Sequence, residues 1–263
     1  MRVISYINWK GGVGKTTLAI NTAYALGEWF NDGLRILFID TDKQANASTW
    51  FDADPDKPTL TDLFRGTADI SEVIQKTRYQ NIDLLAADAG LLDINIEILR
   101  DQKTRQDTIL KEALTPIWND YDICIIDNPP DSNIPVLNGL TIVDDLIAVT
   151  LPNRFSVNGI YQLQDELDNY KDALGLNATI RGVVINQSTA FCSDIYNELK
   201  ENYYMMPTIR GGKNTQKWLD KVVNQQKSIF EICPGSGYAQ DIKKFVSKLS
   251  ELIQASFTGE KVL

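Results

Sequence analysis

Histidine is absent from this 263-residue chain, and cysteine is scarce. Without histidine the chain lacks the commonest general base and the commonest transition-metal ligand, so any hydrolysis must depend on carboxylates, lysines and a bound ion. The three cysteines, Cys124, Cys192 and Cys233, lie far apart and form no C-x-x-C pair. This spacing argues against a disulfide framework and against a zinc site.

Long apolar runs are also missing. No uninterrupted run approaches the roughly 18 residues needed to span a bilayer, and residues 1–8 lack the basic and apolar regions of a signal peptide. We therefore expect a cytoplasmic protein. The content of 43% hydrophobic and 23% charged residues is typical of a globular protein, and no linker or repeat divides the sequence. We predict a single domain over residues 1–263.

The formal net charge of −9 argues against nucleic acid as a partner, because binding to phosphates is largely electrostatic. The charge is unevenly distributed, however. Residues 200–263 hold 10 Lys and Arg against 6 Asp and Glu, whereas residues 1–199 hold 16 against 29. Any basic surface is therefore expected in the C-terminal part of the chain.

Short apolar runs alternate with longer amphipathic stretches along the chain. This alternation predicts an α/β fold, a doubly wound and mostly parallel sheet with helices on both faces. Asp52–Pro58, with its aspartates and prolines, is the best candidate for an exposed loop. The predicted buried strands are Val3–Ile7, Ile36–Ile39, Ile82–Ala86, Ile123–Ile126, Leu146–Leu151 and Ile180–Ile185.

A glycine-rich loop, Trp9–Thr17, follows the first predicted strand and leads into a helical pattern over Leu18–Trp29. Glycines allow successive backbone N–H groups to converge on an anion; Lys15 supplies a charge for the β- and γ-phosphates, and the Thr16 hydroxyl can ligate Mg²⁺. A chance glycine-rich turn is a poor alternative, because strand, loop, Lys-Thr and helix occur together. The predicted nucleotide-binding residues here are Gly11, Gly12, Val13, Gly14, Lys15, Thr16 and Thr17.

Carboxylates follow two of the other predicted strands. Asp40 and Asp42 leave the second strand two residues apart, and Asp127 ends the run Ile123–Ile126 just before two prolines. Ligands of open α/β sheets bind at the carboxyl ends of the strands. Asp40 and Asp42 point the same way if the chain is extended there, so both can face a phosphate group. The alternative is that they are only caps at the end of the strand.

The details of these motifs resemble one family. Trp9 stands where an ordinary phosphate loop has its first glycine, and Lys10 is an additional lysine. Residues 40–46 are similar to the D-x-D-x-Q-x-N signature, with Lys43 in place of the usual proline, and residues 127–130 match D-x-P-P. The chain thus resembles the deviant Walker A family that contains the ParA/Soj partition ATPases, MinD and the nitrogenase iron protein. The segment 151–159 is similar to ParA proteins as well, with no chemistry assigned to it.

The resemblance implies an ATPase that uses ATP and Mg²⁺ and forms a homodimer when ATP is bound. In it, Lys10 would reach the partner's nucleotide and act in catalysis with Lys15, while Asp42 would position the hydrolytic water. Asp127 would be the Mg²⁺-associated acid of the Walker B strand, and Asp40 would support the ion through water. Asn186, after the last predicted strand, would bind adenine, although asparagine is also a common turn residue there.

The resemblance is compatible with three branches of this family, and small-molecule synthetases with the same fold are a fourth alternative. The cysteines are not placed to hold an iron–sulfur cluster, so the iron-protein branch is set aside. A MinD-like positioning ATPase would need a membrane-binding C-terminal helix. The apolar stripe in Ile242–Ile253 could serve, but stripes of this kind are usually core, and the tail Ala255–Leu263 is a poor anchor, so membrane binding is not expected. A small-molecule synthetase would need a substrate pocket that the sequence does not reveal.

The ParA/Soj branch is the leading hypothesis, with the MinD-like branch second. It implies nonspecific DNA binding by the ATP-bound dimer, association with the nucleoid, and a ParB-like adaptor that stimulates slow hydrolysis. Lys213, Lys217 and Lys221 fall four residues apart, just after Arg210, and would share one face of a helix. These four residues are the candidate DNA contacts, and a merely solvated helix face is an equal alternative.

Overall fold

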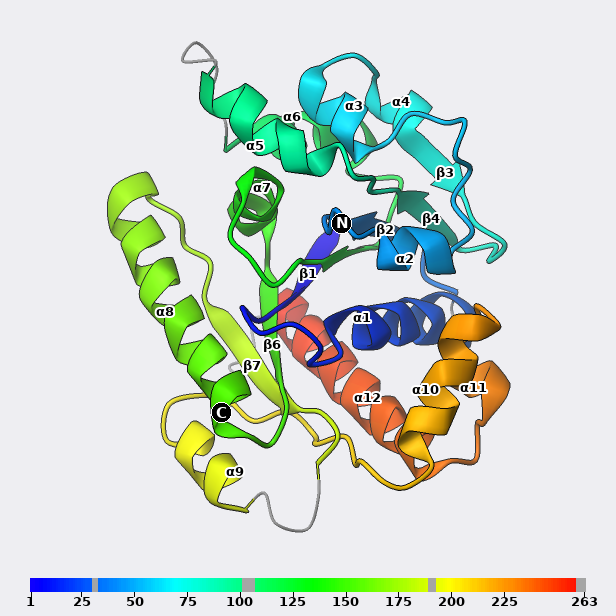
Figure 1. Cartoon of the computed structure of the whole chain (residues 1–263), viewed down its shortest axis with the longest axis vertical. Helices are drawn as coiled ribbons and strands as arrows, with labels where there is room; N and C mark the ends of the chain where they lie inside the picture. Colours follow the sequence, from blue (N-terminus) through cyan, green and yellow to red (C-terminus); the bar gives the residue numbers. More distant parts are fainter. Residues whose placement is uncertain (30–32, 101–106, 189–192, 259–263) are drawn as a thin grey trace.

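The computed structural model describes residues 1–29, 33–100, 107–188 and 193–258; Cys192 and the tail after Thr258 lie outside them. One sheet runs through the described residues in the order β3-β4-β2-β5-β1-β6-β7 (Figure 1). All neighbouring strands are parallel except β3 and β4. The strands are β1 (Arg2–Ile7), β2 (Ile36–Asp40), β3 (Ile74–Lys76), β4 (Ile82–Leu85), β5 (Ile123–Asp127), β6 (Asp145–Thr150) and β7 (Ile180–Ile185).

The six predicted strands are all present, which confirms the α/β prediction. The seventh, β3, is missed because it is only three residues long and pairs antiparallel at the edge of the sheet. Residues 204–209 also run along β7, where Val183 donates to the Tyr204 carbonyl and accepts from the Met206 N–H, and the Ile185 carbonyl accepts from the Ile209 N–H. This segment has no strand-like pattern of its own, so its position depends on tertiary contacts.

Helices lie on both faces of the sheet (Figure 1). The glycine-rich loop leads directly into α1, and the predicted helix over Leu18–Trp29 is divided between α1 and a π-helical turn. The elements are α1 (Lys15–Tyr24), η1 (Ala25–Trp29), α2 (Asn46–Trp50), α3 (Leu60–Arg65), α4 (Ile70–Val73), α5 (Leu91–Arg100), α6 (Ile109–Leu114), η2 (Thr115–Ile117), α7 (Ile134–Ile142), α8 (Arg154–Leu174), α9 (Ser193–Lys200), α10 (Thr215–Asn224), α11 (Ile229–Ile232) and α12 (Gly237–Thr258).

Side chains alternate between the two faces of each strand, so the core has two main layers. On β1, Ile4 and Tyr6 pack with α1 and α12, whereas Val3 packs on the opposite face with α3, α5 and α6. All five residues of β2 and of β5 are buried, as expected for central parallel strands with both faces covered. The predicted loop Asp52–Pro58 connects α2 to α3 and is largely exposed, which confirms that prediction.

The apolar stripe of the C-terminal helix belongs to the core. Ile242, Phe245, Val246 and Leu249 are fully buried on α12 and pack with α1 and the sheet. This confirms that core packing explains the stripe, and these side chains have no face left for a membrane. Within the described residues, no helix has the length and apolar character that crossing a bilayer requires.

Candidate functional site

The glycine-rich loop joins β1 to α1 at the carboxyl edge of the sheet. Gly12 and Gly14 have φ values of +75° and +96°, a left-handed region that glycine adopts without strain. At Gly14 there is also no room for a side chain, because a Cβ atom would lie 2.2 Å from Asn186 Nδ2. The sequence therefore dictates this loop, and α1 begins immediately after it at Lys15.

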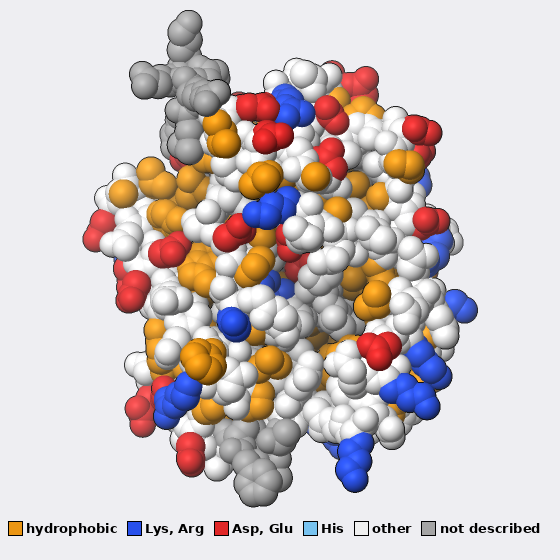
Figure 2. Space-filling view, in the orientation of Figure 1, with side chains coloured by type: hydrophobic (Ala, Val, Ile, Leu, Met, Phe, Trp, Pro, Cys, Tyr) orange, Lys and Arg blue, Asp and Glu red, His pale blue; other side chains and the backbone are white. Residues whose placement is uncertain are grey.

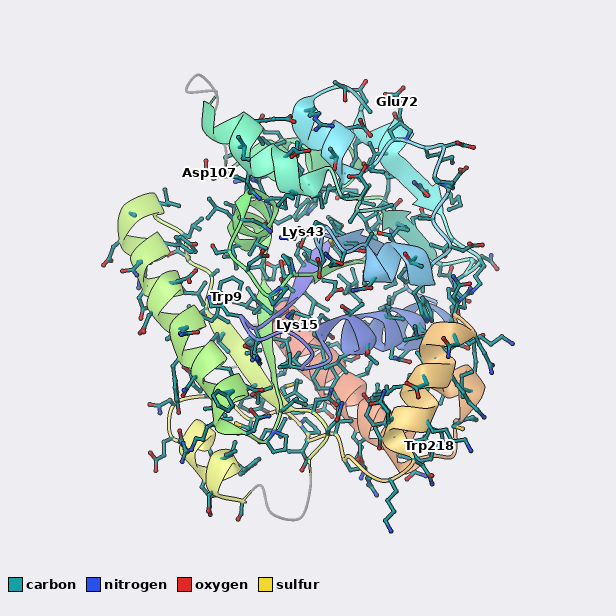
Figure 3. All side chains as sticks on the ribbon, viewed as in Figure 1. Trp9, Lys15, Lys43, Glu72, Asp107 and Trp218 are labelled. Carbon is teal, nitrogen blue, oxygen red and sulfur yellow. The ribbon has the colours of Figure 1, made fainter. Side chains whose placement is uncertain are left out.

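Lys15 is only 6% exposed and folds back onto the loop. Its Nζ donates hydrogen bonds to the carbonyl oxygens of Asn8, at 3.0 Å, and of Lys10, at 3.4 Å. Burial lowers the pKa of Lys15, while the charges of Asp127 and Asp42 oppose that change. Figure 3 shows Lys15 at the start of α1 and Trp9 in the loop that precedes it.

Asp127 ends β5 and is 1% exposed, and neither of its carboxylate oxygens has a hydrogen-bond partner of normal geometry among the described residues. Burial raises the pKa of Asp127 well above its ordinary value, and the charge of Asp40 adds to this rise. Lys15 and the Thr16 hydroxyl act in the opposite direction. A buried acid without a partner is costly, so Asp127 is suited to a ligand that brings positive charge.

Asp40 lies beside Asp127, because the two are paired residues of neighbouring strands. Its Oδ2 accepts hydrogen bonds from the backbone N–H and the hydroxyl of Ser48, at 2.9 and 2.8 Å. Burial raises the pKa of Asp40 to about 6. Asp42 is only partly buried and accepts a hydrogen bond from the Gln44 N–H. The two acids of the D-x-D segment thus differ: Asp40 is held against α2, and Asp42 faces the cavity described below.

These residues fit a magnesium ion. Mg²⁺ takes one or two carboxylates, keeps several waters and is completed by phosphate oxygens, so it does not require a cage of protein ligands. The described residues contain no group of three or more His, Cys, Asp or Glu that could hold a metal alone. The unpartnered oxygens of Asp127, close to the Thr16 hydroxyl and to Asp40, are the chemistry that such an ion needs.

A cavity of about 520 Å³ opens above the loop, a size typical of ligand sites. It is lined by all seven predicted loop residues and by two others from the predicted site, Asp42 and Asn186, whereas Asp40 and Asp127 lie outside the lining. The Asn186 amide donates to the Val13 carbonyl at 2.9 Å, and its oxygen accepts from the Gln187 N–H. Asn186 therefore braces the loop as well as facing the cavity.

Gln44, Asn46, Asn128 and Pro130, from the segments that carry the strand-end aspartates, also line the cavity. Another part of the cavity wall is not apparent from the sequence. One side is formed by α10, whose residues carry no nucleotide-binding pattern, and Tyr238 of α12 contributes a buried hydroxyl. No local signal could have identified them, because only the fold brings residues 216–238 to a loop at residues 9–17. These wall residues are Gln187, Gln216, Leu219, Asp220, Val223, Asn224 and Tyr238.

Lys10 lies outside the cavity lining. Its side chain is exposed and forms no ion pair with any described residue. Its backbone N–H, by contrast, is fixed by a 2.8 Å hydrogen bond to Asn8 Oδ1. The two lysines of the loop thus occupy different environments: Lys15 is buried against the chain's own site, and Lys10 points to solvent.

The four predicted DNA-contacting residues also separate into two groups. Lys217 and Lys221 are exposed on α10, but Lys213 precedes this helix, which begins at Thr215. The prediction that all three lysines share one helix face is therefore wrong for Lys213, which is exposed in the segment before the helix. Arg210 is bound to Asp241, with Nε–Oδ2 at 2.5 Å and Nη2–Oδ1 at 2.8 Å. The charge of Arg210 is therefore already matched within the chain, which leaves the three lysines.

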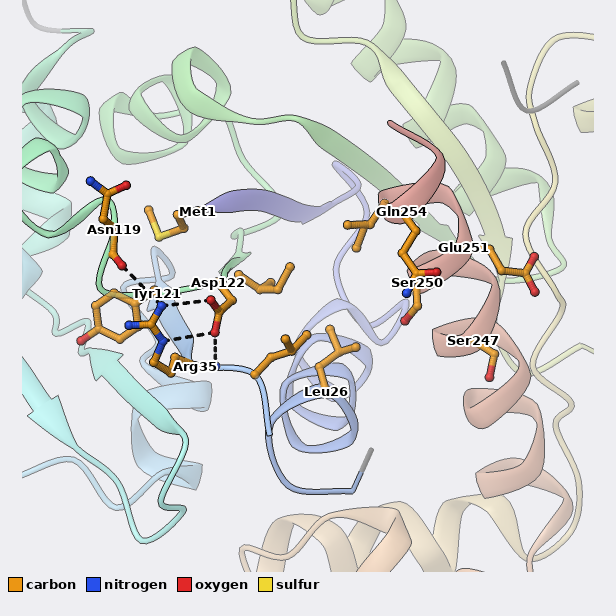
Figure 4. Close-up of a pocket in the computed structure, with 13 residues that line it drawn as sticks. Met1, Leu26, Arg35, Asn119, Tyr121, Asp122, Ser247, Ser250, Glu251 and Gln254 are labelled. Carbon is orange, nitrogen blue, oxygen red and sulfur yellow. Dashed lines mark hydrogen bonds and ion pairs between the residues drawn. The ribbon is translucent and has the colours of Figure 1, made fainter. Parts of the chain in front are cut away.

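A larger cavity of about 730 Å³ lies elsewhere, between the amino ends of the strands and the last turns of α12 (Figure 4). Arg35 and Asp122 form an ion pair in its wall at 3.0 Å. It contains none of the glycine-rich loop, the aspartates at the strand ends or Asn186. Its size alone therefore does not make it the nucleotide site.

Comparison with known proteins agrees with the site. Residues 1–181 match the AAA domain family AAA_31. The chromosome partitioning protein ParA of Caulobacter vibrioides is 34% identical over 189 residues, which cover 70% of this chain and 69% of that protein. The virulence plasmid ParA family protein pGP5-D of Chlamydia psittaci is 26% identical and covers 100% of this chain and 98% of its own length.

The fold also matches solved structures. A variant of Cyanothece McdA in complex with ATP gives a TM-score of 0.80 at 21% identity, covering 100% of this chain and 98% of that one. The structural match thus agrees with the parallel sheet, and the family model and the sequence relatives point to the same group of proteins as the deviant glycine-rich loop and the strand-end aspartates. This chain belongs to the ParA/MinD superfamily of P-loop ATPases.

Proposed function

We propose that this protein is a DNA-partition ATPase. ATP and Mg²⁺ bind at the cavity above the glycine-rich loop, and the ATP-bound chain forms a homodimer that holds DNA without sequence preference. A ParB-like adaptor then stimulates a slow hydrolysis that releases the DNA. The relationship to ParA of C. vibrioides and to the plasmid ParA family protein of C. psittaci supports this proposal.

The observation that carries the proposal is the position of α10. One face of this helix lines the nucleotide cavity through Gln216, Asp220 and Asn224, and another exposes Lys217 and Lys221. Figure 2 shows basic side chains gathered over the region of α10 and α11. A helix that contacts the nucleotide on one side and presents lysines on the other can make DNA binding depend on the nucleotide.

A second contact ties α10 to the hydrolytic segment. Trp50, on α2, donates from Nε1 to the Val222 carbonyl at 2.9 Å, and the Gln226 amide donates to the Thr49 carbonyl. The same short helix holds Asp40 through Ser48. A displacement of the D-x-D segment can therefore be transmitted through α2 to α10, the helix that carries Lys217 and Lys221.

We assign roles in the site from the family resemblance, and this geometry is compatible with them. Lys15 and the loop N–H groups hold the β- and γ-phosphates, Thr16 and Asp127 hold Mg²⁺ with support from Asp40, and Asp42 positions the attacking water. Lys10 completes the site of the second chain, where its positive charge stabilises the transferring phosphoryl group. Asn186, Tyr238 and α10 enclose the base. The DNA-bound dimer would be associated with the nucleoid.

DNA retention by the protein with ATP and with ADP, at two salt concentrations, tests the proposal. Binding with ATP alone is expected, and the combined change Lys217→Ala and Lys221→Ala should weaken it and reduce the salt slope by about one per lysine in contact. The matched control replaces two exposed lysines on helices away from α10, Lys111 of α6 and Lys171 of α8, with the same change in net charge. Equal retention with both nucleotides, or equal loss in the control, would contradict the DNA-binding proposal.

A further inference from the structure

Asn8 is the last residue before the deviant part of the loop, and it is fully buried. Its Nδ2 donates to the carbonyl of Val149, at 2.7 Å, and to that of Ser156, at 3.1 Å. Its Oδ1 accepts the backbone N–H of Lys10 at 2.8 Å. One amide thus joins the end of β6, the first turn of α8 and the glycine-rich loop.

Gly159 provides the space for this amide. It is a buried residue of α8, and a Cβ atom there would lie 2.2 Å from Asn8 Oδ1 and 3.3 Å from the Lys10 nitrogen. No side chain fits at 159 unless Asn8 moves. This gives the segment 151–159, whose resemblance to ParA proteins had no chemical explanation, a specific role: its helix approaches the loop closely enough to hold Asn8.

Asn8 acts on the two lysines of the loop by different atoms. Lys15 Nζ is held by the backbone carbonyl of Asn8, which any residue at position 8 would supply. The N–H of Lys10 is held by the side chain, which other residue types would not supply in the same geometry. Removing the Asn8 side chain should therefore disturb Lys10 while leaving Lys15 with the shorter of its two hydrogen bonds, the one to the Asn8 carbonyl.

We infer that Asn8 is a positioning residue for Lys10 and that Gly159 is present to admit it. The pair fixes the backbone of the exposed lysine against β6 and α8, so that its side chain leaves the chain in a defined direction. This inference rests on the proposed function, in which Lys10 completes the site of a second chain.

The test compares Asn8→Ala, Gly159→Ala and their combination for ATP-dependent dimerisation, hydrolysis, ATP affinity of the monomer and melting temperature. Asn8→Ala should reduce dimerisation and hydrolysis at least about tenfold, because small misplacements of catalytic groups have effects of this size, and should change ATP affinity by less than about threefold. Gly159→Ala should reduce the melting temperature and both activities. In the combination the melting temperature should recover, since the smaller alanine at position 8 leaves space for the new methyl group, but hydrolysis should not.

Two controls separate positioning from stability. Gly139 is a buried glycine of α7 where a Cβ would make ordinary contacts, the nearest at 3.4 Å, so Gly139→Ala should leave hydrolysis unchanged. Asn138 is also fully buried and holds the Leu110 N–H and the Ile134 carbonyl, away from the loop. Asn138→Ala should lower the melting temperature but allow dimerisation below it. Recovery of hydrolysis in the Asn8/Gly159 combination, or equal loss in Asn138→Ala, would overturn the inference.

Lys10→Ala completes the experiment. If Asn8 acts through Lys10, then Asn8→Ala should add nothing to the loss of dimerisation in a Lys10→Ala background. Fully additive losses would overturn the inference. An unaffected Lys10→Ala variant would contradict the role proposed for Lys10 rather than the link from Asn8 to Lys10. Failure of the unaltered protein to dimerise with ATP would instead contradict the proposed function itself, so the two failures are distinguishable.

Discussion

Two buried aspartates at opposite edges of the same sheet have contrasting surroundings. Asp145, at the start of β6, is fully buried and accepts two hydrogen bonds from the Arg2 guanidinium, at 2.6 and 3.0 Å, with Arg181 at 3.6 Å. Asp127, at the end of β5, is equally buried but has no partner of normal geometry for either oxygen among the described residues. At the amino edge of the sheet the buried carboxylate of Asp145 is paired. At the carboxyl edge the buried carboxylate of Asp127 has no such partner among the described residues.

The contrast separates residues that stabilise the fold from residues kept for a ligand. Loss of the partner of a paired buried acid is strongly destabilising, whereas an unpaired buried acid lowers stability until an ion binds. The same contrast appears in the two lysines of the loop, since Lys15 is bonded within its own chain and Lys10 is exposed.

The largest change in stability is expected for a substitution of Asp145, at the amino edge of the sheet. Asp145→Asn should lower the free energy of unfolding by about 3 kcal/mol, because it removes the buried charge that accepts two hydrogen bonds from the partly buried Arg2 guanidinium. Urea unfolding followed by circular dichroism measures this. A loss below about 1 kcal/mol would show that Asp145 does not secure this edge.

The opposite change in the free energy of unfolding is expected for a substitution of Asp127, at the carboxyl edge of the sheet. Asp127→Asn should raise the free energy of unfolding by about 1 kcal/mol near pH 8 without Mg²⁺, because a buried unpaired charge is removed. The raised pKa of Asp127 means that the folded protein holds the proton more tightly than the unfolded chain, so stability is lost as pH rises through that pKa.

The gain should therefore shrink as the pH is lowered from 8 toward 5, because protonation of Asp127 in the unaltered protein removes the same buried charge. Thermal melts at both pH values, with and without Mg²⁺ and ATP, test the prediction. The variant should also lose the stabilisation that Mg²⁺ with ATP gives the unaltered protein. Destabilisation at pH 8 would contradict the account of Asp127.

The smallest effect is expected at an exposed pair. Asp122 and Arg35 form a bidentate ion pair in which both side chains are well exposed, at 39% and 53%. Asp122→Asn should change the free energy of unfolding by about 0.5 kcal/mol or less, because solvent screens exposed charges. If Asp122→Asn and Asp145→Asn gave equal unfolding curves, the expected difference between an exposed and a buried ion pair would be contradicted.

Much of the site could be predicted because its signals are local. The six buried strands and the glycine-rich loop are contiguous in sequence, and parallel strands bring their carboxyl ends to one edge, so Asp42 and Asp127 were placed correctly near the loop. The wall formed by α10 and Tyr238 could not be predicted, because no pattern in residues 216–238 refers to residues 9–17.

Side-chain partners were equally inaccessible from the sequence. The bond from Asn186 to Val13 spans 173 residues, and that from Asn8 to Val149 spans 141. Arg210 fitted the basic pattern, but its pairing with Asp241 depends on how α12 packs beside it. Charge patterns indicate which residues are cationic, and only the fold shows which of them already have a counter-ion.

The central claim is that the nucleotide site is completed by Lys10 of a second chain. Sedimentation with ATP tests it most directly, using Asp42→Ala to slow hydrolysis and adding Lys10→Ala or Lys15→Ala to that variant. We predict that the parent is a dimer with ATP and a monomer with ADP. The Lys10→Ala protein should bind ATP but remain a monomer, and the Lys15→Ala protein should lose both ATP binding and dimerisation. A Lys10→Ala protein that dimerises with ATP as readily as its parent would contradict the claim.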